Sequence, residues 1–413
     1  MKKHGLLIVL LILALLATGC QTETAQPQGS SPNSLVVPNA TRPEDIEPTV
    51  EYGWTDGESP VPIKRIGVVR AGTNLTPHAV SPSGVYFFDT SGGDNTFIIY
   101  ADDGTDTFIK LCGRPDCTHD NSDCNAYIFS GKALSYYGGY LYAASGNTAA
   151  SLEARLIRMN PDGSNHVTVM DLTKFAKENG GDYAKCDIIT DGFCLFSVYG
   201  WKIISEDGDS TESVSSHKGY YYYKLDGSME APERAEVNGL ACYSCGDVFL
   251  VHNPNPVEGS RYGSYYNWNP DTNCTTFLTH HPGGPGWYGE NEGYYFQDGY
   301  IYRLTYATRK TEPMVDTGLE GYYYLFAFPD CIVLASNEQH ATDNNLYFYN
   351  WSFELLDTVH IPNPNSTRTN FLLIAETADR FILTTSLEGM PKSYICKSEL
   401  GTGNLELHEF IYA

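Results

Sequence analysis

The chain has 413 residues, of which 50 are Asp or Glu and 26 are Lys or Arg, so its formal charge at pH 7 is −24. A chain this acidic repels phosphate backbones, which argues against nucleic acid as a ligand. Aromatic residues make up 13% of the chain, with 31 Tyr against 18 Phe, and there are 39 Gly. This composition favours many short strands joined by tight turns and argues against a helical bundle.

Residues 1–19 have the features of a secretory signal peptide. A short basic start with Lys2 and Lys3 precedes an apolar run over residues 6–17, and small residues follow directly before Cys20. The apolar run is too short to cross a membrane as a helix, which needs about 20 apolar residues. We therefore expect export and removal of residues 1–19. Because this segment contains two Lys and no acid, the formal charge of the mature chain is −26.

The segment 16–20 (Leu-Ala-Thr-Gly-Cys) resembles the lipobox of bacterial lipoproteins, in which small residues precede a cysteine that becomes diacylated and then N-terminal. It departs from that pattern at Ala17, where leucine is usual. The resemblance implies that Cys20 is the lipidation site and that its lipid holds the chain at the extracytoplasmic face of the cell membrane. Two acyl chains are enough for stable attachment to a membrane, since each buried CH₂ contributes about 0.8 kcal/mol to binding. The alternative is an ordinary secreted protein in which Cys20 follows the signal by chance.

The composition of residues 20–60 predicts a flexible tether after the lipidated cysteine. The stretch 21–34 is polar, contains Pro, and is almost free of large apolar side chains. Such a segment cannot bury enough apolar surface to offset the entropy lost on ordering. About 40 residues behaving as a coil would reach roughly 35 Å from the membrane.

Residues 61–413 are predicted to form one all-β domain, a β-propeller, because one pattern recurs along them. The pattern contains an aromatic strand, a second strand, a polar turn and a third strand. Its copies lie roughly 40 residues apart, the spacing of four-stranded propeller blades. The seven copies occupy residues 85–111, 134–170, 193–227, 248–268, 293–304, 331–350 and 381–396. We therefore expect seven blades, with six as the alternative if one copy is a distorted insertion.

Turns and closure can be predicted from the same pattern. Asp-Gly pairs such as Asp298-Gly299 lie between strands, and they predict type I′ hairpin turns, which require positive φ. Only residues 171–179 resemble a helix, and they fall between the second and third copies. Residues 62–70 are a candidate strand that would join the last copy and close the ring, which removes exposed sheet edges.

A cluster of possible metal ligands follows the last strand of the first copy. Three cysteines and one histidine lie within 13 residues: Cys112, Cys117, His119 and Cys124. Three thiolates and an imidazole are a common ligand set for structural zinc. The alternative is a disulfide with a spare thiol, since exported proteins favour disulfides and the spacing of four, one and four intervening residues is not that of a standard zinc finger. Metal binding and disulfide formation are both open at this point.

This run of ligands, placed after a strand and before propeller repeats, resembles an element of lipoproteins from anaerobic Gram-positive bacteria. Those proteins are similar to this chain in having a lipobox, a polar tether and propeller-like repeats of a domain of unknown function. The resemblance covers most of the chain. It implies a β-propeller fold and a location at the membrane, but those proteins have no settled activity that could be transferred to this chain.

The sequence contains no Gly-x-Ser-x-Gly elbow, no His-Glu-x-x-His motif and no phosphate-binding loop. We therefore expect a binding or scaffold module with a protein or glycan ligand rather than an enzyme. Two alternatives remain: a polysaccharide-active enzyme whose site is built from distant blade loops, and an accessory subunit of an envelope complex. Structural zinc is the one cofactor that the residues suggest.

Overall fold

The computed structural model describes residues 78–413 apart from several short segments. Those segments are residues 147–152, 191, 208–209, 238–240, 246–247, 254–262, 281–285, 290, 322, 337–344, 362–370 and 386–390. The chain separates into two compact units, Met1–Val36 and Val37–Ala413, and all described residues belong to the second. The predicted signal peptide, Cys20, the tether and the candidate closing strand 62–70 lie outside the described residues. No helix among the described residues is long and apolar enough to cross a membrane.

The described strands form seven small sheets, numbered here sheet 1 to sheet 7, which follow one another along the chain. In each of them the first four strands in chain order pair antiparallel with their neighbours as a meander, and sheet 1 has further strands. Sheet 1 contains β1 (His78–Ser81), β2 (Gly84–Gly92), β3 (Asn95–Asp102), β4 (Thr107–Lys110) and β5 (Tyr127–Phe129). Sheet 2 contains β6 (Ala133–Tyr137), β7 (Tyr140–Ser145), β8 (Arg155–Met159) and β9 (Val167–Asp171). Sheet 3 contains β10 (Tyr183–Thr190), β11 (Phe193–Asp207), β12 (Ser210–Lys224) and β13 (Glu233–Arg234).

The remaining four sheets each have four strands. Sheet 4 contains β14 (Ala241–Cys245), β15 (Val248–Asn253), β16 (Ser264–Asn269) and β17 (Cys274–His280). Sheet 5 contains β18 (Gly286–Tyr288), β19 (Glu292–Gln297), β20 (Tyr300–Thr305) and β21 (Lys310–Asp316). Sheet 6 contains β22 (Tyr323–Ala327), β23 (Ile332–Ser336), β24 (Asn345–Tyr349) and β25 (Leu355–His360). Sheet 7 contains β26 (Phe371–Glu376), β27 (Arg380–Thr385), β28 (Pro391–Cys396) and β29 (His408–Glu409).

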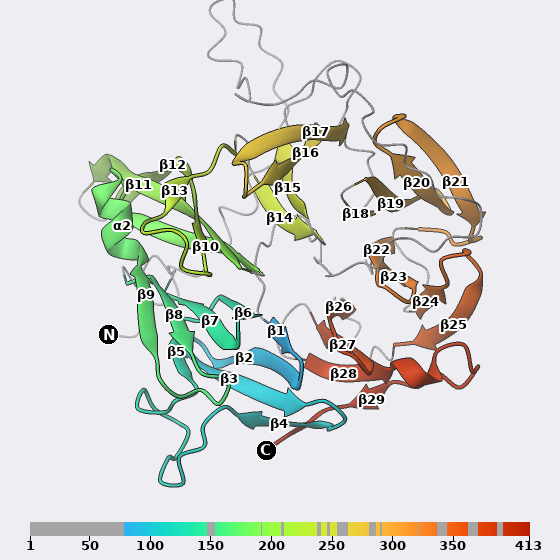
Figure 1. Ribbon diagram of the computed structural model, residues 1–413, viewed down its shortest axis with the longest axis horizontal. Helices are drawn as coiled ribbons and strands as arrows, with labels where there is room; N and C mark the ends of the chain where they lie inside the picture. The colour runs from blue at the N-terminus through green and yellow to red at the C-terminus, as the bar shows by residue number, and fades with distance from the viewer. Residues whose placement is uncertain are drawn as a thin grey trace, which may run out of the picture. The chain divides into compact units, whose positions relative to one another are not determined.

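Neighbouring sheets contact each other largely through their first strands, and the last sheet contacts the first. Thus β6 lies against both β1 and β10, and β26 lies against β1. Sheets 4 and 5 meet where the rings of Tyr265 and Tyr288 lie 4.8 Å apart. The sheets are therefore arranged in a ring (Figure 1). The predicted β-propeller is confirmed, and each of the seven sequence copies lies in a sheet of its own.

The C-terminal segment joins sheet 7 to sheet 1. After β29, the short strand β30 (Ile411–Tyr412) pairs in parallel with β4, the outer strand of sheet 1. Phe410 directly precedes β30 in the sequence, and its ring lies 4.8 Å from that of Phe108 in β4. Within the described residues the ring is thus closed from the C-terminal side.

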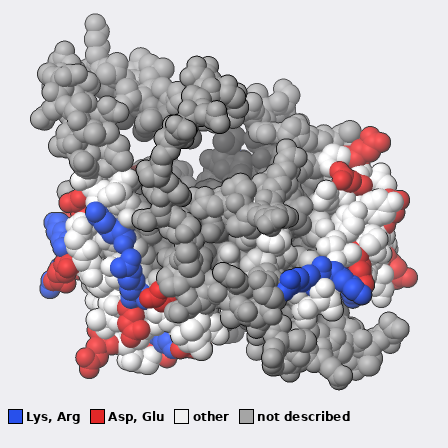
Figure 2. All heavy atoms as spheres, turned by 90° about the horizontal axis from the view of Figure 1, so that it is seen from above, with Lys and Arg blue, Asp and Glu red and all other residues white. Residues whose placement is uncertain are grey.

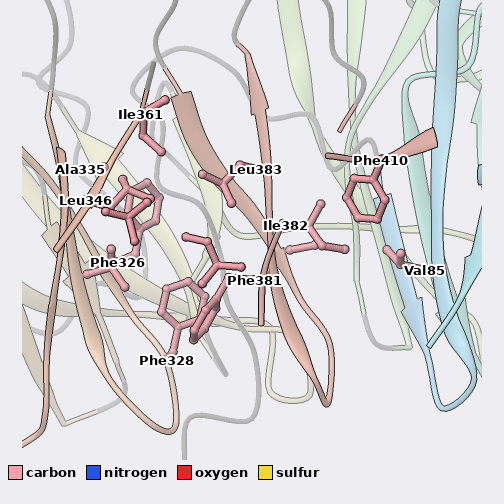
Figure 3. Packing of buried hydrophobic residues seen from close by; sticks show 14 of the residues in the cluster. Val85, Phe326, Phe328, Ala335, Leu346, Ile361, Phe381, Ile382, Leu383 and Phe410 are labelled. Atoms are coloured by element: carbon pink, nitrogen blue, oxygen red, sulfur yellow. The ribbon is translucent and has the colours of Figure 1, made fainter. Parts of the chain in front are cut away.

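The core consists of apolar side chains between adjacent sheets. At the junction of sheets 6 and 7, the ring of Phe381 in β27 lies 4.7 Å from that of Phe328, and both are labelled in Figure 3. The ring of Phe348 lies 5.7 Å from that of Phe381. All three rings are fully buried. Burying a side chain of this size stabilises the fold by roughly 1.5–3 kcal/mol, so these contacts hold the sheets at fixed positions.

The turns follow the predicted chemistry in part. Asp298 and Gly299 both have positive φ and connect β19 to β20, as a type I′ turn requires. At Asp103-Gly104 and Asp162-Gly163 only the glycine of the pair has positive φ, because the connections there are longer than the two residues of a type I′ turn. Gly163 also permits a close approach, since a Cβ atom at this position would lie 2.4 Å from the carbonyl oxygen of Leu111.

One α-helix is present in the described part of the chain, where the sequence predicts it. Helix α2 (Leu172–Glu178) begins after Asp171, whose carboxylate accepts the backbone N–H of Lys174 at 2.8 Å. This N-cap satisfies a helix N–H group that has no partner within the helix. Phe175 packs edge-on against Phe196 of sheet 3, so the helix covers the junction of sheets 2 and 3.

On the surface shown in Figure 2, basic and acidic side chains of the described residues are interspersed. Charged side chains also pair in the described part of the chain, for example Arg303 with Glu312 at 2.7 Å. The described part of this face therefore presents mixed charge, although the whole chain is strongly acidic.

Candidate metal centre

The predicted ligand cluster lies in the loop formed by residues 111–126, named here the Cys₃His loop. The strands on either side of it, β4 and β5, both pair with β3: β4 with its C-terminal part and β5 with its N-terminal part. The loop thus leaves sheet 1 and returns to the same edge of it (Figure 1). At its base, Ile98 accepts the N–H of Leu111 at 2.9 Å and donates its own to Ala126 at 2.7 Å.

Short turns bring the ligands toward each other. The N–H of Cys117 bonds the carbonyl of Arg114 at 3.3 Å, and the N–H of Cys124 bonds the carbonyl of Asn121 at 3.1 Å. The guanidinium of Arg114 donates to the carbonyl of Asp123 at 2.6 Å and so links the two turns. These turns form because Pro, Asp, Asn and Ser favour them.

Residues of sheet 2 contact both ends of the Cys₃His loop. The turn between β8 and β9 places Gly163 against the carbonyl of Leu111, at the start of the loop. Nearby, Nε2 of His166 lies 2.9 Å from the carbonyl oxygen of Asn125, at its end. Both ends of the Cys₃His loop are therefore fixed by a neighbouring sheet as well as by β3.

The structure brings all four predicted ligands together. The Sγ atoms of Cys112, Cys117 and Cys124 and a ring nitrogen of His119 all lie within 4.8 Å of one another. The distance from Cys124 Sγ to His119 Nδ1 is 3.6 Å. In a tetrahedral zinc site a thiolate sulfur and an imidazole nitrogen lie about 3.6 Å apart, given bond lengths of about 2.3 and 2.0 Å. The separation of Cys124 and His119 is therefore that of two ligands in such a site.

The backbone at His119 is held in an uncommon conformation. Its φ is 57°, in the left-handed region, which few residues other than glycine adopt. Its carbonyl oxygen accepts Lys110 Nζ at 2.8 Å, and its N–H donates to Cys117 Sγ at 3.4 Å. These bonds fix the residue that must turn its ring toward the three sulfurs.

Burial affects the thiols unequally. Cys124 is 3% exposed and belongs to the core between sheets 1 and 2, and burial raises the pKa of its thiol to about 12. Burial also acts to raise the pKa of Cys112, but the backbone N–H groups of Arg114 and Asn125 stabilise its thiolate and bring the pKa below its usual range. A bound cation would favour the thiolate at every position, because thiols lose their protons on coordination.

The arrangement indicates what the site can do. Four protein ligands complete a tetrahedron and leave no open position for water or substrate, so a metal here would be structural. Cys112, Cys117 and Cys124 are free cysteines in the structure. The predicted lipidation site Cys20 lies outside the described residues.

A second group of metal-ligand side chains was missed by sequence reasoning. Cys396, Glu399 and His408 offer one ligand atom each, and these atoms lie within 4.8 Å of one another. Cys396 was recognised only as a strand residue of the last copy. The spacing of two and eight intervening residues matches no common motif, and the group depends on strand pairing across sheet 7.

No protein-family model matches the chain, and no curated protein matches it. Among solved structures, the chain is similar to acylaminoacyl peptidase from Pyrococcus horikoshii, with a TM-score of 0.44 and 11% identity over 81% of this chain and 52% of the peptidase. The chain thus spans about half the length of that enzyme. It is also similar to the β-propeller domain of the Trilobed protease from Pyrococcus furiosus, with a TM-score of 0.41 and 12% identity over 71% of this chain and 85% of that one. For apo AztD from Citrobacter koseri the TM-score is 0.40, with 11% identity over 82% and 86% of the two chains.

Proposed function

We propose that this protein is a lipid-anchored β-propeller on the extracytoplasmic face of the cell membrane. It acts as a binding or scaffold module, and its first blade carries a structural Zn²⁺ ion. The observation that supports the metal is the convergence of Cys112, Cys117, His119 and Cys124 within 4.8 Å. The support for the anchor is the lipobox-like segment that ends at Cys20.

Zinc fits this ligand set better than other common ions. Thiolate and imidazole ligands suit the borderline-soft Zn²⁺, whereas calcium and magnesium require oxygen ligands. Residues 113–123 contain no large apolar side chain, so burial of large apolar side chains does not hold this part of the loop. Metal binding would supply that folding free energy, as it does in other small metal-stapled segments.

The experiment for the metal is a measurement of zinc content. The mature chain is purified without a metal-binding tag and without chelator, and zinc per chain is compared between wild type and His119→Ala. We expect the variant to lose one zinc per chain. His360→Ala is the control, because this histidine bonds Asn345 in sheet 6 and belongs to no ligand group. Unchanged zinc content, or a disulfide between two of the three cysteines seen by mass spectrometry, contradicts the proposal.

The binding function rests on the scaffold. A closed ring of sheets presents loops from rigid elements, and such loops commonly carry recognition. A glycan array, combined with an assay for released sugar, distinguishes a glycan-binding module from a polysaccharide-active enzyme. Crosslinking and purification from membranes tests for a protein partner. Product formation would replace the binding proposal by an enzymatic one, and a stable stoichiometric complex would assign an accessory subunit.

A further inference from the structure

The side chains of Cys396, Glu399 and His408, named here the β28–β29 cluster, meet at the outer part of sheet 7. Cys396 ends β28, and the 3₁₀-helix η2 (Lys397–Glu399) follows directly. His408 begins β29 and pairs with Tyr394 of β28. Because residues two apart on a strand point to the same side, Cys396 and Tyr394 share one face of the sheet with His408. The turn of η2 then carries the carboxylate of Glu399 onto that face.

We propose that the β28–β29 cluster is a second metal site, with three protein ligands, for a borderline-soft divalent ion such as Zn²⁺. The three ligand atoms lie within 4.8 Å of one another. Nε2 of His408 is 3.1 Å from Oε1 of Glu399. A tetrahedral zinc ion places nitrogen and oxygen ligands about 3.3 Å apart. The observed separation of the His408 nitrogen and the Glu399 oxygen is close to that value.

The surroundings hold the ligands in place. The backbone N–H of Glu406 donates to Glu399 Oε2 at 3.2 Å, and hydrogen bonds of this kind orient a ligating carboxylate. The imidazole of His408 stacks on the ring of Tyr394, with centroids 5.1 Å apart and planes inclined by 23°. The imidazole and the carboxylate are therefore fixed before a metal binds.

A positive charge close by does not prevent cation binding. Arg380 lies opposite Cys396 in the pairing of β27 with β28. Its guanidinium is 2.7 Å from the carboxylate of Asp379, so its charge is compensated within the pair. Glu399 and a Cys396 thiolate would then supply the net negative charge that attracts a divalent ion.

A simple ion pair between His408 and Glu399 accounts for less of the arrangement. Both side chains are about one-third exposed, and pairs of this kind contribute at most about 1 kcal/mol. The pair alone gives no reason for the thiol of Cys396 to lie with them. A sulfur, a nitrogen and an oxygen ligand together are a donor set for zinc rather than for calcium or magnesium.

With three protein ligands, the β28–β29 cluster differs chemically from the four-ligand site of the Cys₃His loop. A tetrahedral ion in the β28–β29 cluster keeps one position for water or a small anion. The partial exposure of His408 and Glu399 leaves that position accessible from solvent. The two sites thus differ in coordination: the first is closed and structural, and the second is open to exchange.

The test uses the full mature chain, stripped of metal and reloaded with Zn²⁺ or Co²⁺. We expect two zinc ions per wild-type chain. One is lost in Cys396→Ser, the other in His119→Ala, and both in the double variant. Glu409→Gln is the matched control, since this exposed carboxylate is next to His408 on β29 but outside the cluster. If Cys396→Ser does not fold, Glu399→Gln serves instead, because it keeps a side-chain acceptor for Glu406 and His408.

A second readout reports the open position. Azide added to the Co²⁺-loaded protein should change the visible spectrum of wild type and of His119→Ala, and leave that of Cys396→Ser unchanged. Equal metal content in wild type and Cys396→Ser overturns the second site, whatever His119→Ala shows. An azide-insensitive spectrum in His119→Ala overturns the open position. Loss of one zinc in Cys396→Ser alone would keep this site and reject the Cys₃His site.

Discussion

The guanidinium of Arg380, in β27 of sheet 7, donates a hydrogen bond to the backbone carbonyl oxygen of Thr105, in the turn between β3 and β4 of sheet 1. The adjacent Asp379 accepts the N–H of Gly104 at 3.1 Å. Arg380 is 5% exposed, so its bonds form largely away from water. Two neighbouring side chains thus hold one turn of the first sheet against the last.

Replacing Arg380 by alanine should destabilise the ring. Removing one partner of a fully buried ion pair costs 3–5 kcal/mol; because Asp379 is 40% exposed, we expect a loss of about 2–3 kcal/mol. Urea unfolding followed by circular dichroism measures it. Arg155→Ala is the control, since its pair with Glu153 is solvent-exposed and contributes at most about 1 kcal/mol. If both variants lose the same free energy of unfolding, the junction of sheets 7 and 1 does not depend on the contact of Arg380.

The stability of sheet 5 should depend on the protonation of Glu292. Burial raises the pKa of this carboxyl above its ordinary 4.5, although the hydroxyl of Tyr294 and the charge of Arg303 act in the opposite direction. Its contribution to stability is therefore full below pH 4.5 and is lost as the pH rises through the raised pKa. We expect the free energy of unfolding of Glu292→Gln, relative to wild type, to increase between pH 4 and pH 7.

Glu312 provides the control for that measurement. A hydrogen bond from Arg303 lowers the pKa of this exposed carboxyl, so its contribution is present above its ordinary pKa and is lost as the pH falls. Relative to wild type, Glu312→Gln should therefore lose stability as the pH rises toward 4.5 and stay level above it, where Glu292→Gln gains stability. The same pH trend in both variants would contradict the assignment.

Metal removal should open the Cys₃His loop while the propeller stays folded. Residues 113–123 bury no large apolar side chain, so the metal would be the main source of their order. After chelation, a serine endoprotease that cuts after aspartate should cleave at Asp116, Asp120 or Asp123 at least about tenfold faster, as expected for local opening. Cleavage at Asp316, at the end of β21 in sheet 5, is the internal control. Added zinc should restore protection of the loop against cleavage. Equal cleavage with and without metal would contradict the proposal that a bound metal orders the Cys₃His loop.

The lipid anchor is tested by Cys20→Ala in the full precursor. With no acyl acceptor, the protein should appear in the medium or stay unprocessed, because lipid on Cys20 would be its attachment. Fractionation and N-terminal sequencing distinguish these two outcomes. A variant that stays with the membranes and still has a mature N-terminus would disprove lipidation at this cysteine.

Features that depend on local sequence could be predicted, and those that depend on distant pairing could not. The seven copies, the helix after Asp171 and the turn at Asp298-Gly299 each follow from a few adjacent residues. The Cys₃His loop was predictable because its ligands lie within 13 residues. The β28–β29 cluster and β30 escaped prediction, since the first forms through strand pairing and the second has only two residues. A strand that short shows no periodicity.

The closure by β30 has a consequence for folding kinetics. The contact between Asp379 and Gly104 joins residues 275 positions apart in the chain. Bringing together the ends of a segment this long costs about 5 kcal/mol of chain entropy, before any contact offsets it. Contacts of such sequence separation also slow folding. Sheet 1 is synthesised before the other sheets, but its outer edge stays open until Ile411 and Tyr412 are available to pair with β4. The blade that emerges first is thus completed last, and its formation should be the slow step in assembly of the ring.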